Sequence, residues 1–269
     1  MQDVIAIVTS KGGIIVSTLV IFMVLERLFP VARWVGGLWR VMKNIGLAGF
    51  NALLSPLIVL PLTLFAAGHG LGWRPESWSG GWVVLLDLLI LDCWIYWWHR
   101  ANHELPFLWR FHEVHHLDET LDASSALRFH FGELFLSALV RAVVIIALAI
   151  PLQSVLVFEA LVLVAAIFHH ANWRLPAGFE RALSRVIITP SRHWVHHHRV
   201  RRDTDSTYGT IFSFWDPLFR STTPTQRTQL MEIGVEGREE ADLIALIGLP
   251  SRGAAAVEAE PTATPAEVA

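Results

Sequence analysis

The 269-residue sequence contains little charge and almost no cysteine. Asp, Glu, Lys and Arg make up only 17% of the chain, whereas about 25% is usual in a soluble domain, which argues against a cytosolic enzyme. The formal net charge of -3 gives no electrostatic reason to expect a nucleic-acid partner. Cys93 is the single cysteine, so neither an intrachain disulfide nor a metal site built from several thiolates can form. A Gly-rich GxGxxG fingerprint is also missing, so no built-in nucleotide-binding domain is predicted.

Hydrophobic residues, by contrast, make up 53% of the chain and gather in long runs. A bilayer core of about 30 Å needs about 20 apolar residues in a helix. Five segments have suitable lengths, and they are residues 12–30, 45–68, 81–98, 133–150 and 153–170. Pro56 and Pro61 predict a kink in the second segment. Arg141 lies inside the fourth, which leaves a shallow re-entrant pair as an alternative, and we predict an all-α transmembrane helical bundle of four to five spans.

Basic residues predict how this bundle is oriented. The loop 31–44, the segment 99–132 and the chain after 171 carry most of the arginines, whereas the loop 69–80 carries only Arg74. Basic loops stay in the cytoplasm, which places the N-terminus outside. The N-terminus lacks a basic region before its first apolar run, and that run reaches spanning length, so no cleavable signal peptide is predicted. We therefore expect an integral, multi-pass protein of a bacterial inner membrane.

Thirteen histidines are the most unusual feature of the composition. Eight of them form three clusters, which are His99 with His103, His112 with His115 and His116, and His193 with His196 and His197. Residues at i, i+3 and i+4 share one face of a helix, so each cluster should present its imidazoles together. One metal ion takes four to six ligands, so eight imidazoles suit two ions.

The predicted topology brings the histidine clusters to one face of the membrane. The first cluster ends the third span, the second follows it directly, and the last lies just beyond the fifth span. His130 precedes the fourth span and His170 ends the fifth, so both belong to the same face. Scattered surface or core histidines are the simpler explanation for any single position, but not for three spaced motifs at one level. We expect a cytoplasmic helical cap that holds a histidine-rich dimetal site.

Asp92 is an acidic residue inside the third span, on the same helical stripe as Tyr96, His99 and His103. Inserting an Asp there costs about 2.5–3.5 kcal/mol, so it needs a partner. A metal-bound imidazole commonly donates its second N–H to a carboxylate, which is one possible role for Asp92. A pairing with Arg141 or with another helix is the alternative, and the sequence leaves both open.

Residues 83–220 resemble the fatty acid hydroxylase / sterol desaturase superfamily of integral membrane di-iron enzymes. The resemblance rests on separate motifs in one order, which are Asp92…Tyr96-Trp-Trp-His99-Arg-Ala-Asn-His103, Trp109-Arg-Phe-His112-Glu-Val-His115-His116, Arg128-Phe-His130, His170-Ala-Asn172, Thr189-Pro-Ser-Arg-His193-Trp-Val-His196-His197, Asp205-Ser-Thr-Tyr208-Gly209 and Trp215-Asp216-Pro-Leu-Phe219. Phe131 stands where the family commonly has proline, which puts the local turn in doubt.

The resemblance implies a ligand set and a cofactor. Its ligands are His99, His103, His112, His115, His116, His193, His196 and His197, with His130 and His170 as two further ones. The side chains expected to support them are Asp92, Tyr96, Asn172, Asp205 and Tyr208. His169 and His198 are expected to be bystanders or supporting residues. The implied cofactor is a pair of iron ions that uses O2 as co-substrate, although an all-imidazole site would also bind zinc.

The implied activity is an O2-dependent oxidoreductase of the EC 1.14 type that hydroxylates or desaturates an unactivated C–H position of a lipid. Fatty acyl, sterol-like and other isoprenoid lipids all stay open as substrates. The chain has no room for a haem domain, so we expect a separate electron donor, a ferredoxin or a cytochrome with its reductase. Arg199, Arg201 and Arg202 could dock an acidic partner, or they could simply reflect the basic cytoplasmic side.

Three other functions are alternatives to this one. A zinc-dependent membrane hydrolase would use the same ligands without redox chemistry. A metal transporter would hold its ligands near the middle of the bilayer, and a membrane cytochrome would need single histidines on facing helices. The expected organisation is N-terminal transmembrane helices over 1–80, a catalytic domain over 81–224, a cytoplasmic segment over 225–252 and a disordered low-complexity tail over 253–269.

Overall fold

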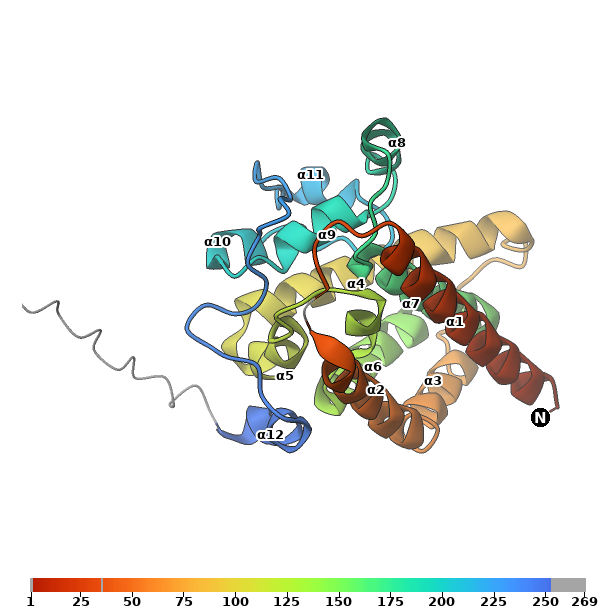
Figure 1. The fold of residues 1–269 in the computed structure, drawn as a ribbon. Helices are drawn as coiled ribbons and strands as arrows, with labels where there is room; N and C mark the ends of the chain where they lie inside the picture. Colours follow the sequence, from red (N-terminus) through yellow and green to blue (C-terminus); the bar gives the residue numbers. More distant parts are fainter. Residues whose placement is uncertain (1, 35, 253–269) are drawn as a thin grey trace, which may run out of the picture.

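The computed structural model describes residues 2–34 and 36–252, without the side chains of residues 2–11. The regular elements in these ranges are helices, with three isolated β-bridges, and this confirms the all-α class (Figure 1). The helices are α1 (Gln2–Leu28), α2 (Gly37–Leu54), α3 (Val59–Gly68), α4 (Gly81–Glu104), α5 (Pro106–His116), η1 (Ala123–Leu127), α6 (Phe131–Leu148), α7 (Leu152–His170), α8 (Ala177–Leu183), α9 (Pro190–His196), α10 (Arg201–Thr204), α11 (Trp215–Phe219), α12 (Leu243–Gly248) and η2 (Leu249–Arg252). The tail 253–269, expected to be disordered, lies outside the described residues.

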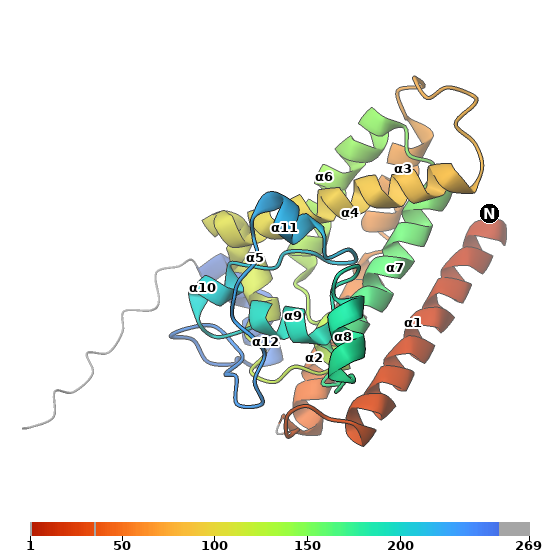
Figure 2. The ribbon, with the colours of Figure 1, turned by 90° about the horizontal axis from the view of Figure 1, so that it is seen from above.

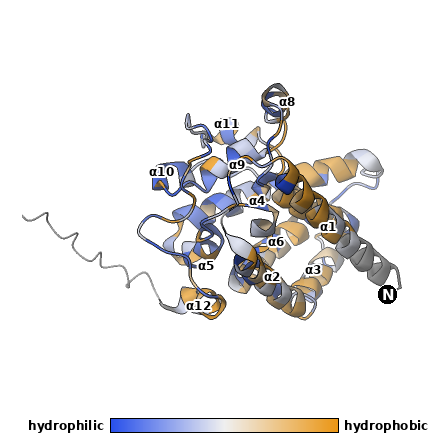
Figure 3. Cartoon of the chain, viewed as in Figure 1, coloured by the Kyte–Doolittle hydropathy of each residue, from blue (hydrophilic) through white to orange (hydrophobic). Residues whose placement is uncertain are grey.

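Three helices of the described chain are long and apolar enough to cross a membrane, namely α4, α6 and α7. They correspond to the spans predicted over 81–98, 133–150 and 153–170. Pro151 lies directly before α7, so proline separates the last two spans as predicted. In Figure 3 the coloured part of α1 and most of α3 are hydrophobic, whereas α10 is hydrophilic. The chain is therefore an integral membrane protein with a polar end.

The span predicted over 45–68 is broken into two helices. α2 and α3 form a pair bent by 48°, and counting this pair as one span gives up to four spans among the described residues. The break includes Pro56, which cannot donate to a continuing helix, whereas Pro61 lies in the first turn of α3, where proline is tolerated. The span predicted over 12–30 falls on α1, whose first residues have no described side chains.

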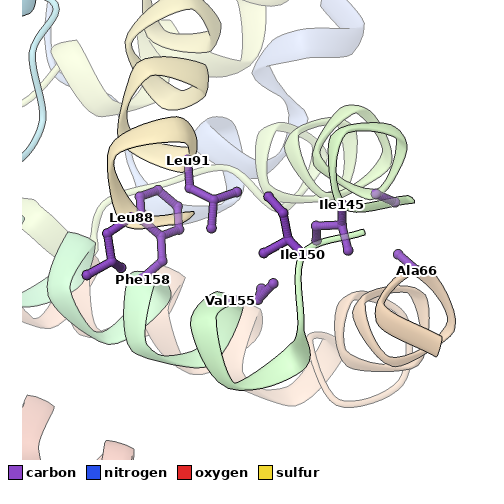
Figure 4. Packing of buried hydrophobic residues seen from close by; sticks show 8 residues of the cluster. Ala66, Leu88, Leu91, Ile145, Ile150, Val155 and Phe158 are labelled. Atoms are coloured by element: carbon purple, nitrogen blue, oxygen red, sulfur yellow. The ribbon is translucent and has the colours of Figure 1, made fainter. Parts of the chain in front are cut away.

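An apolar core joins α3, α4, α6 and α7 at the end of the bundle away from the histidines. Figure 4 shows Leu88 and Leu91 of α4 close to Phe158 of α7, with Ile145 of α6 and Ala66 of α3 completing the cluster. In a bilayer, tight packing rather than removal of water drives helix association, and small residues let backbones approach. This core holds the helices that lead to the site in fixed positions.

A cap of short helices covers the opposite end of the bundle. α5, α9, α10 and α11 lie together there, although they are far apart in the sequence (Figure 2). Buried ion pairs attach α2 to the loop after α5: the Arg40 guanidinium donates from Nε to Asp118 Oδ1 over 2.5 Å and from Nη1 to Asp122 Oδ2 over 2.6 Å. Asn44 adds a bond to Asp118. Removing one partner would leave a buried charge unpaired, so this network fixes the loop.

The C-terminal segment returns across the cap. Leu246 of α12 is fully buried against Leu47 of α2 and Val114 of α5. Glu240 accepts a bond from Arg128, which is itself completely buried beside α5. The chain after the last helix of the cap therefore packs back onto the helix that carries three of the predicted ligands.

Candidate metal centre

Nine of the ten histidines predicted as ligands converge in two groups that could each hold a metal ion. The five-histidine group consists of His99, His103, His112, His116 and His196. The four-histidine group consists of His115, His170, His193 and His197. Within each group the candidate ligand atoms lie within 4.8 Å of one another. The two groups adjoin, since the rings of His116 and His197 stack with centroids 4.3 Å apart.

Two short helices, α5 and α9 with its C-cap residue, present six of these nine imidazoles, and the long helices α4 and α7 present the other three. Pro106 opens α5 and Pro190 opens α9, and proline at the first position fixes the backbone angle of a helix without losing a needed N–H. Each helix then places histidines at i, i+3 and i+4. Neighbouring histidines diverge by about 100° around the helix, so His115 and His116 enter different groups, as do His196 and His197.

Backbone carbonyls fix the tautomer of several ligands. The Nδ1 atoms face carbonyl oxygens in four cases, which are His99 to Tyr208 (2.9 Å), His115 to Arg128 (3.2 Å), His170 to Ala166 (2.7 Å) and His196 to Ser206 (2.7 Å). A carbonyl oxygen only accepts, so each Nδ1 carries the proton. The Nε2 lone pair of each ring is then free to bind a metal ion.

The free lone pairs point at one another. His170 Nε2 lies 3.0 Å from His115 Nε2 and 3.0 Å from His193 Nε2. Because His115 and His170 both hold their protons on Nδ1, two lone pairs face each other, and a cation between them relieves the repulsion. Ligand nitrogens about 2.0–2.1 Å from one ion lie about 2.8–3.4 Å apart in octahedral (cis) or tetrahedral geometry, and this range includes these contacts. The residues present therefore fit a metal ion.

The five-histidine group gives the same indication. Nε2 of His103 and Nε2 of His196 are buried and have no hydrogen-bond partner in the described chain. His112 Nε2 lies 3.2 Å from His116 Nε2, the same kind of lone-pair contact. Unpartnered buried polar atoms are uncommon in native proteins and need an explanation, which a bound metal ion supplies.

Burial keeps the imidazoles of the cap neutral. Loss of water and the neighbouring imidazoles hold the pKa of the cap histidines well below its ordinary value, and these are His115, His116, His193, His196 and His197. A metal ion binds neutral imidazole, so little free energy is needed to remove protons before binding at neutral pH.

Two carboxylates support the five-histidine group. Asp205 Oδ1 lies 3.2 Å from His103 Nδ1, so this predicted residue is placed where it can orient a ligand. Glu133 Oε1 accepts from His112 Nδ1 over 3.0 Å and from Asn102 over 3.2 Å. Sequence reasoning missed Glu133. An acidic residue in the first turn of an apolar span was the available signal, because such a carboxylate needs a partner.

His130 is the predicted ligand that does not join either group. Its Nδ1 accepts from the backbone N–H of Gly132 and caps the start of α6, while its Nε2 lies 3.0 Å from the Ile247 carbonyl. The expectation that His130 is a ligand is therefore corrected to a helix cap. His169 is buried with its ring 3.9 Å from that of His193, and His198 pairs with Asp203, so both lie beside the groups rather than in them.

The remaining supporting residues bind backbone or other side chains. Asp92 accepts from the N–H groups of Ile211 and Phe212 and from the Trp215 indole. Neither an imidazole nor Arg141 is its partner, and the bond from Trp215 of α11 agrees with the alternative of a pairing with another helix. The three donors compensate its burial in a span. Asp92 thus fastens the cap to α4.

Tyr96, Tyr208 and Asn172 complete the predicted set. The Tyr96 hydroxyl lies 2.7 Å from Ser221 Oγ, which ties α4 to the cap. Tyr208 contributes its carbonyl to His99, and its ring lies against that of His103 with centroids 5.3 Å apart. Asn172 holds the connection between α1 and α2 through the backbone of residues 31 and 32. Of the three, only Tyr208 touches a ligand.

A cavity of about 340 Å³ opens beside both groups. Apolar side chains of α4, α6 and α7 make much of its wall, among them Trp98, Leu134 and Phe158. His99 and His112 from one group and His115, His170 and His193 from the other also line it. The site therefore combines two histidine groups that could each hold a metal ion with an apolar cavity between membrane helices, which is the arrangement expected of a metal-dependent enzyme acting on a lipid-like molecule.

The chain belongs to the fatty acid hydroxylase family, whose model matches residues 84–221. This match confirms the resemblance seen in the histidine motifs. No solved structure matches the chain at a significant level.

Several of the similar proteins are named as hydroxylases or monooxygenases of lipids. An ornithine lipid hydroxylase OlsE of Rhizobium tropici is 25% identical over 87% of this chain and 73% of its own length. An alkylglycerol monooxygenase of Danio rerio is 33% identical over 55% of this chain and 32% of its own length. A cholesterol 25-hydroxylase of Mus musculus is 24% identical over 50% of this chain and 45% of its own length. The chain thus spans about a third of the alkylglycerol monooxygenases that it matches, and these relatives agree with a membrane oxidoreductase that acts on lipids.

Proposed function

We propose that this protein is a membrane-bound di-iron oxygenase that hydroxylates or desaturates an unactivated C–H position of a lipid with O2 and externally supplied electrons. The observation that carries the proposal is the pair of adjacent all-imidazole groups whose members line a largely apolar cavity. Family membership and relatives named as lipid hydroxylases and monooxygenases support it.

The proposal assigns the ligands to the two groups as they stand. His99, His103, His112, His116 and His196 hold one iron, and His115, His170, His193 and His197 hold the other. Two iron ions bound there would activate O2 with electrons from the separate donor, which is the chemistry that oxidation of an unactivated C–H bond requires. Asp205 and Glu133 orient His103 and His112 through Nδ1, which keeps Nε2 directed at the metal.

The surrounding residues position the substrate and limit water. Trp98, Leu134 and Phe158 present an apolar wall to an alkyl chain. The cap helices cover the imidazoles on the other side, and all nine ligands are at least nine-tenths buried. Excluding water protects a reactive site from side reactions. The proposed substrate class is a lipid with a fatty acyl, sterol-like or other isoprenoid skeleton.

Electrons are proposed to come from a separate protein, a ferredoxin or a cytochrome with its reductase. The polar cap is proposed to face the cytoplasm of a bacterial cell, at the inner membrane, where such a donor would reach it. Arg199 and Arg201 pair with Glu119 and Asp205 within the chain, so the cap surface is less basic than its arginine content suggests. Residues 81–224 are proposed as the catalytic domain, with 225–252 as a cytoplasmic segment.

The experiment that tests the proposal joins metal analysis with a turnover assay. Protein purified from membranes grown with iron should hold about two irons per chain, as the ligand count predicts. It should consume O2 and reductant only when lipid extract is added, with an oxidised lipid as product. Protein that holds zinc alone, and that hydrolyses lipid without consuming O2, would establish a hydrolase instead. Lipid profiles of a deletion strain and its parent would then identify the substrate.

A further inference from the structure

An ion pair inside the spans lines the same cavity as the histidines. Arg141 of α6 donates from Nη2 to Glu159 Oε1 of α7 over 2.7 Å. Both residues line the cavity whose other wall includes His99, His115 and His170. Charged residues at this depth are costly, and they usually mark a functional site rather than a structural one.

The ion pair with Glu159 leaves one N–H donor of Arg141 without an acceptor. Its Nε is buried and has no hydrogen-bond partner in the described chain. Arg74, in the loop between α3 and α4, provides a contrast, since it pairs with Asp87 and also donates from Nε to the Leu148 carbonyl. A buried N–H without an acceptor is unfavourable, so an unused donor beside a cavity indicates an acceptor that arrives with a ligand.

The ion pair lies at a defined distance from the metal groups. Glu133 marks their level on α6 because it bonds His112, and Arg141 follows eight residues later, about 12 Å along the helix at 1.5 Å per residue. On α7, Glu159 precedes His170 by eleven residues, about 16 Å. The two helices give similar values, so the cavity leads from the imidazoles to the ion pair.

We propose that Arg141, held by Glu159, binds a neutral oxygen atom of the lipid substrate, an ester or amide carbonyl or a hydroxyl. Glu159 already balances the guanidinium charge, so a carboxylate or phosphate would add an uncompensated negative charge in a medium of low dielectric constant. At about 1.25 Å advance per carbon, from bonds of about 1.5 Å, roughly ten carbons separate this oxygen from the carbon that meets the metal groups. The cavity of about 340 Å³ accommodates a chain of that length, at about 30 Å³ per small group.

This inference rests on the proposed oxygenase function, and two probes separate the two claims. The probes are N-methylhexadecanamide, which carries a carbonyl at the chain end, and hexadecane, which carries none. The wild-type membrane enzyme with its reductant should give a higher kcat/KM for the amide, with oxidation centred about ten carbons from the carbonyl. If neither probe is oxidised, the result contradicts the proposed function. If both probes are oxidised with equal kcat/KM values, the result overturns the role of Arg141.

Two variants of Arg141 test how the oxygen is bound. In Arg141→Met the ratio of kcat/KM values, amide over alkane, should fall about 10–100-fold, as for a hydrogen bond from a charged donor. Arg141→Gln loses the same ion pair but keeps an N–H donor, so it should retain several times more of the ratio than Arg141→Met. The matched control is Arg74→Met, which breaks the ion pair of a loop arginine with Asp87, neither of which lines the cavity, and it should leave the ratio unchanged.

The outcomes are distinct. A similar ratio in Arg141→Met and Arg141→Gln means that the ion pair acts only structurally, and it overturns the inference. If Arg141→Met does not accumulate in the membrane, the comparison of Arg141→Gln with wild type and the position of oxidation in wild type still decide, because oxidation at scattered positions is incompatible with a fixed oxygen subsite.

Discussion

The two histidine groups differ in what supports them. In the five-histidine group, Asp205 and Glu133 accept from ligand Nδ1 atoms. In the four-histidine group no carboxylate of the described chain does so, and Nδ1 of His193 and Nδ1 of His197 have no partner there. A carboxylate behind an imidazole raises its basicity and fixes its orientation. The five-histidine group should therefore bind its ion more tightly.

The difference also indicates a division of roles. Iron commonly takes up to six ligands, so five imidazoles nearly fill one coordination sphere, whereas four leave more positions open. Three of the four, His115, His170 and His193, line the cavity. The four-histidine group thus combines looser support with open access to substrate, and the five-histidine group provides the firmer anchor.

The largest effect is expected from removing one ligand of each group. His115→Ala and His196→Ala should each abolish lipid oxidation while leaving membrane insertion intact, because both act at the metal and not in the spans. Each variant should retain about one ion per chain instead of about two. Metal analysis by mass spectrometry and a turnover assay measure this. Activity that survives in both variants would show that the ligand assignment is wrong.

The next largest effect is expected from metal removal, which should distinguish the two histidine groups by their metal affinity. Dialysis against a chelator should release the ions in two steps, with affinities about 10–100-fold apart, because only one group has carboxylate support. In His115→Ala, which damages the four-histidine group, the step that releases the more weakly held ion should disappear. A single step of two ions in the wild type would contradict the asymmetry.

Removing one supporting carboxylate should reduce the difference in metal affinity between the two histidine groups. Asp205→Asn or Glu133→Gln should weaken the more tightly held ion about tenfold and leave the other unchanged, because an amide accepts more weakly from the imidazole N–H. Asp203→Asn is the matched control, since Asp203 bonds His198, Thr223 and Thr225 rather than a ligand. Equal effects of Asp205→Asn and Asp203→Asn on metal affinity would contradict a supporting role of Asp205.

The smallest effect is a pH dependence of stability in the metal-free protein. The pKa of the cap histidines His115, His116, His193, His196 and His197 lies below its ordinary value because of burial. The unfolded chain binds protons below about pH 6.5 while the folded cap does not. The free energy of unfolding should therefore have its maximum value above about pH 7 and decrease as the pH falls below about 6.5.

Thermal unfolding in detergent measures this dependence. Lowering the pH from about 7.5 to 5.5 should reduce the melting temperature of the metal-free protein by about 4 °C or more. His130→Gln serves as a control, because His130 caps α6 outside both groups and should leave the pH dependence unchanged. A melting temperature that is constant over this range would contradict neutral, buried imidazoles in the folded state.

The sequence alone predicted the nine histidines that the structure brings into two groups, and the positions of three membrane helices. Both depend on local patterns: a helix repeats every 3.6 residues, and an apolar run of about 20 residues suits a bilayer. Spacings of three and four residues therefore identified His112, His115, His196 and the other clustered imidazoles before any contact was known. Proline placement likewise predicted the break near Pro56 and the turn at Pro151.

Only the tertiary structure decided which histidines belong to which group and which residues contact them. The divergence of adjacent residues around a helix sends His115 and His116 to different groups, but which group depends on the elements that pack opposite them. Glu133 became a supporting residue, His130 a helix cap and Asp92 a tie between α4 and the cap through contacts with residues distant in the sequence. Hydrogen-bond partners of buried polar groups are set by three-dimensional packing, and sequence spacing carries no record of them.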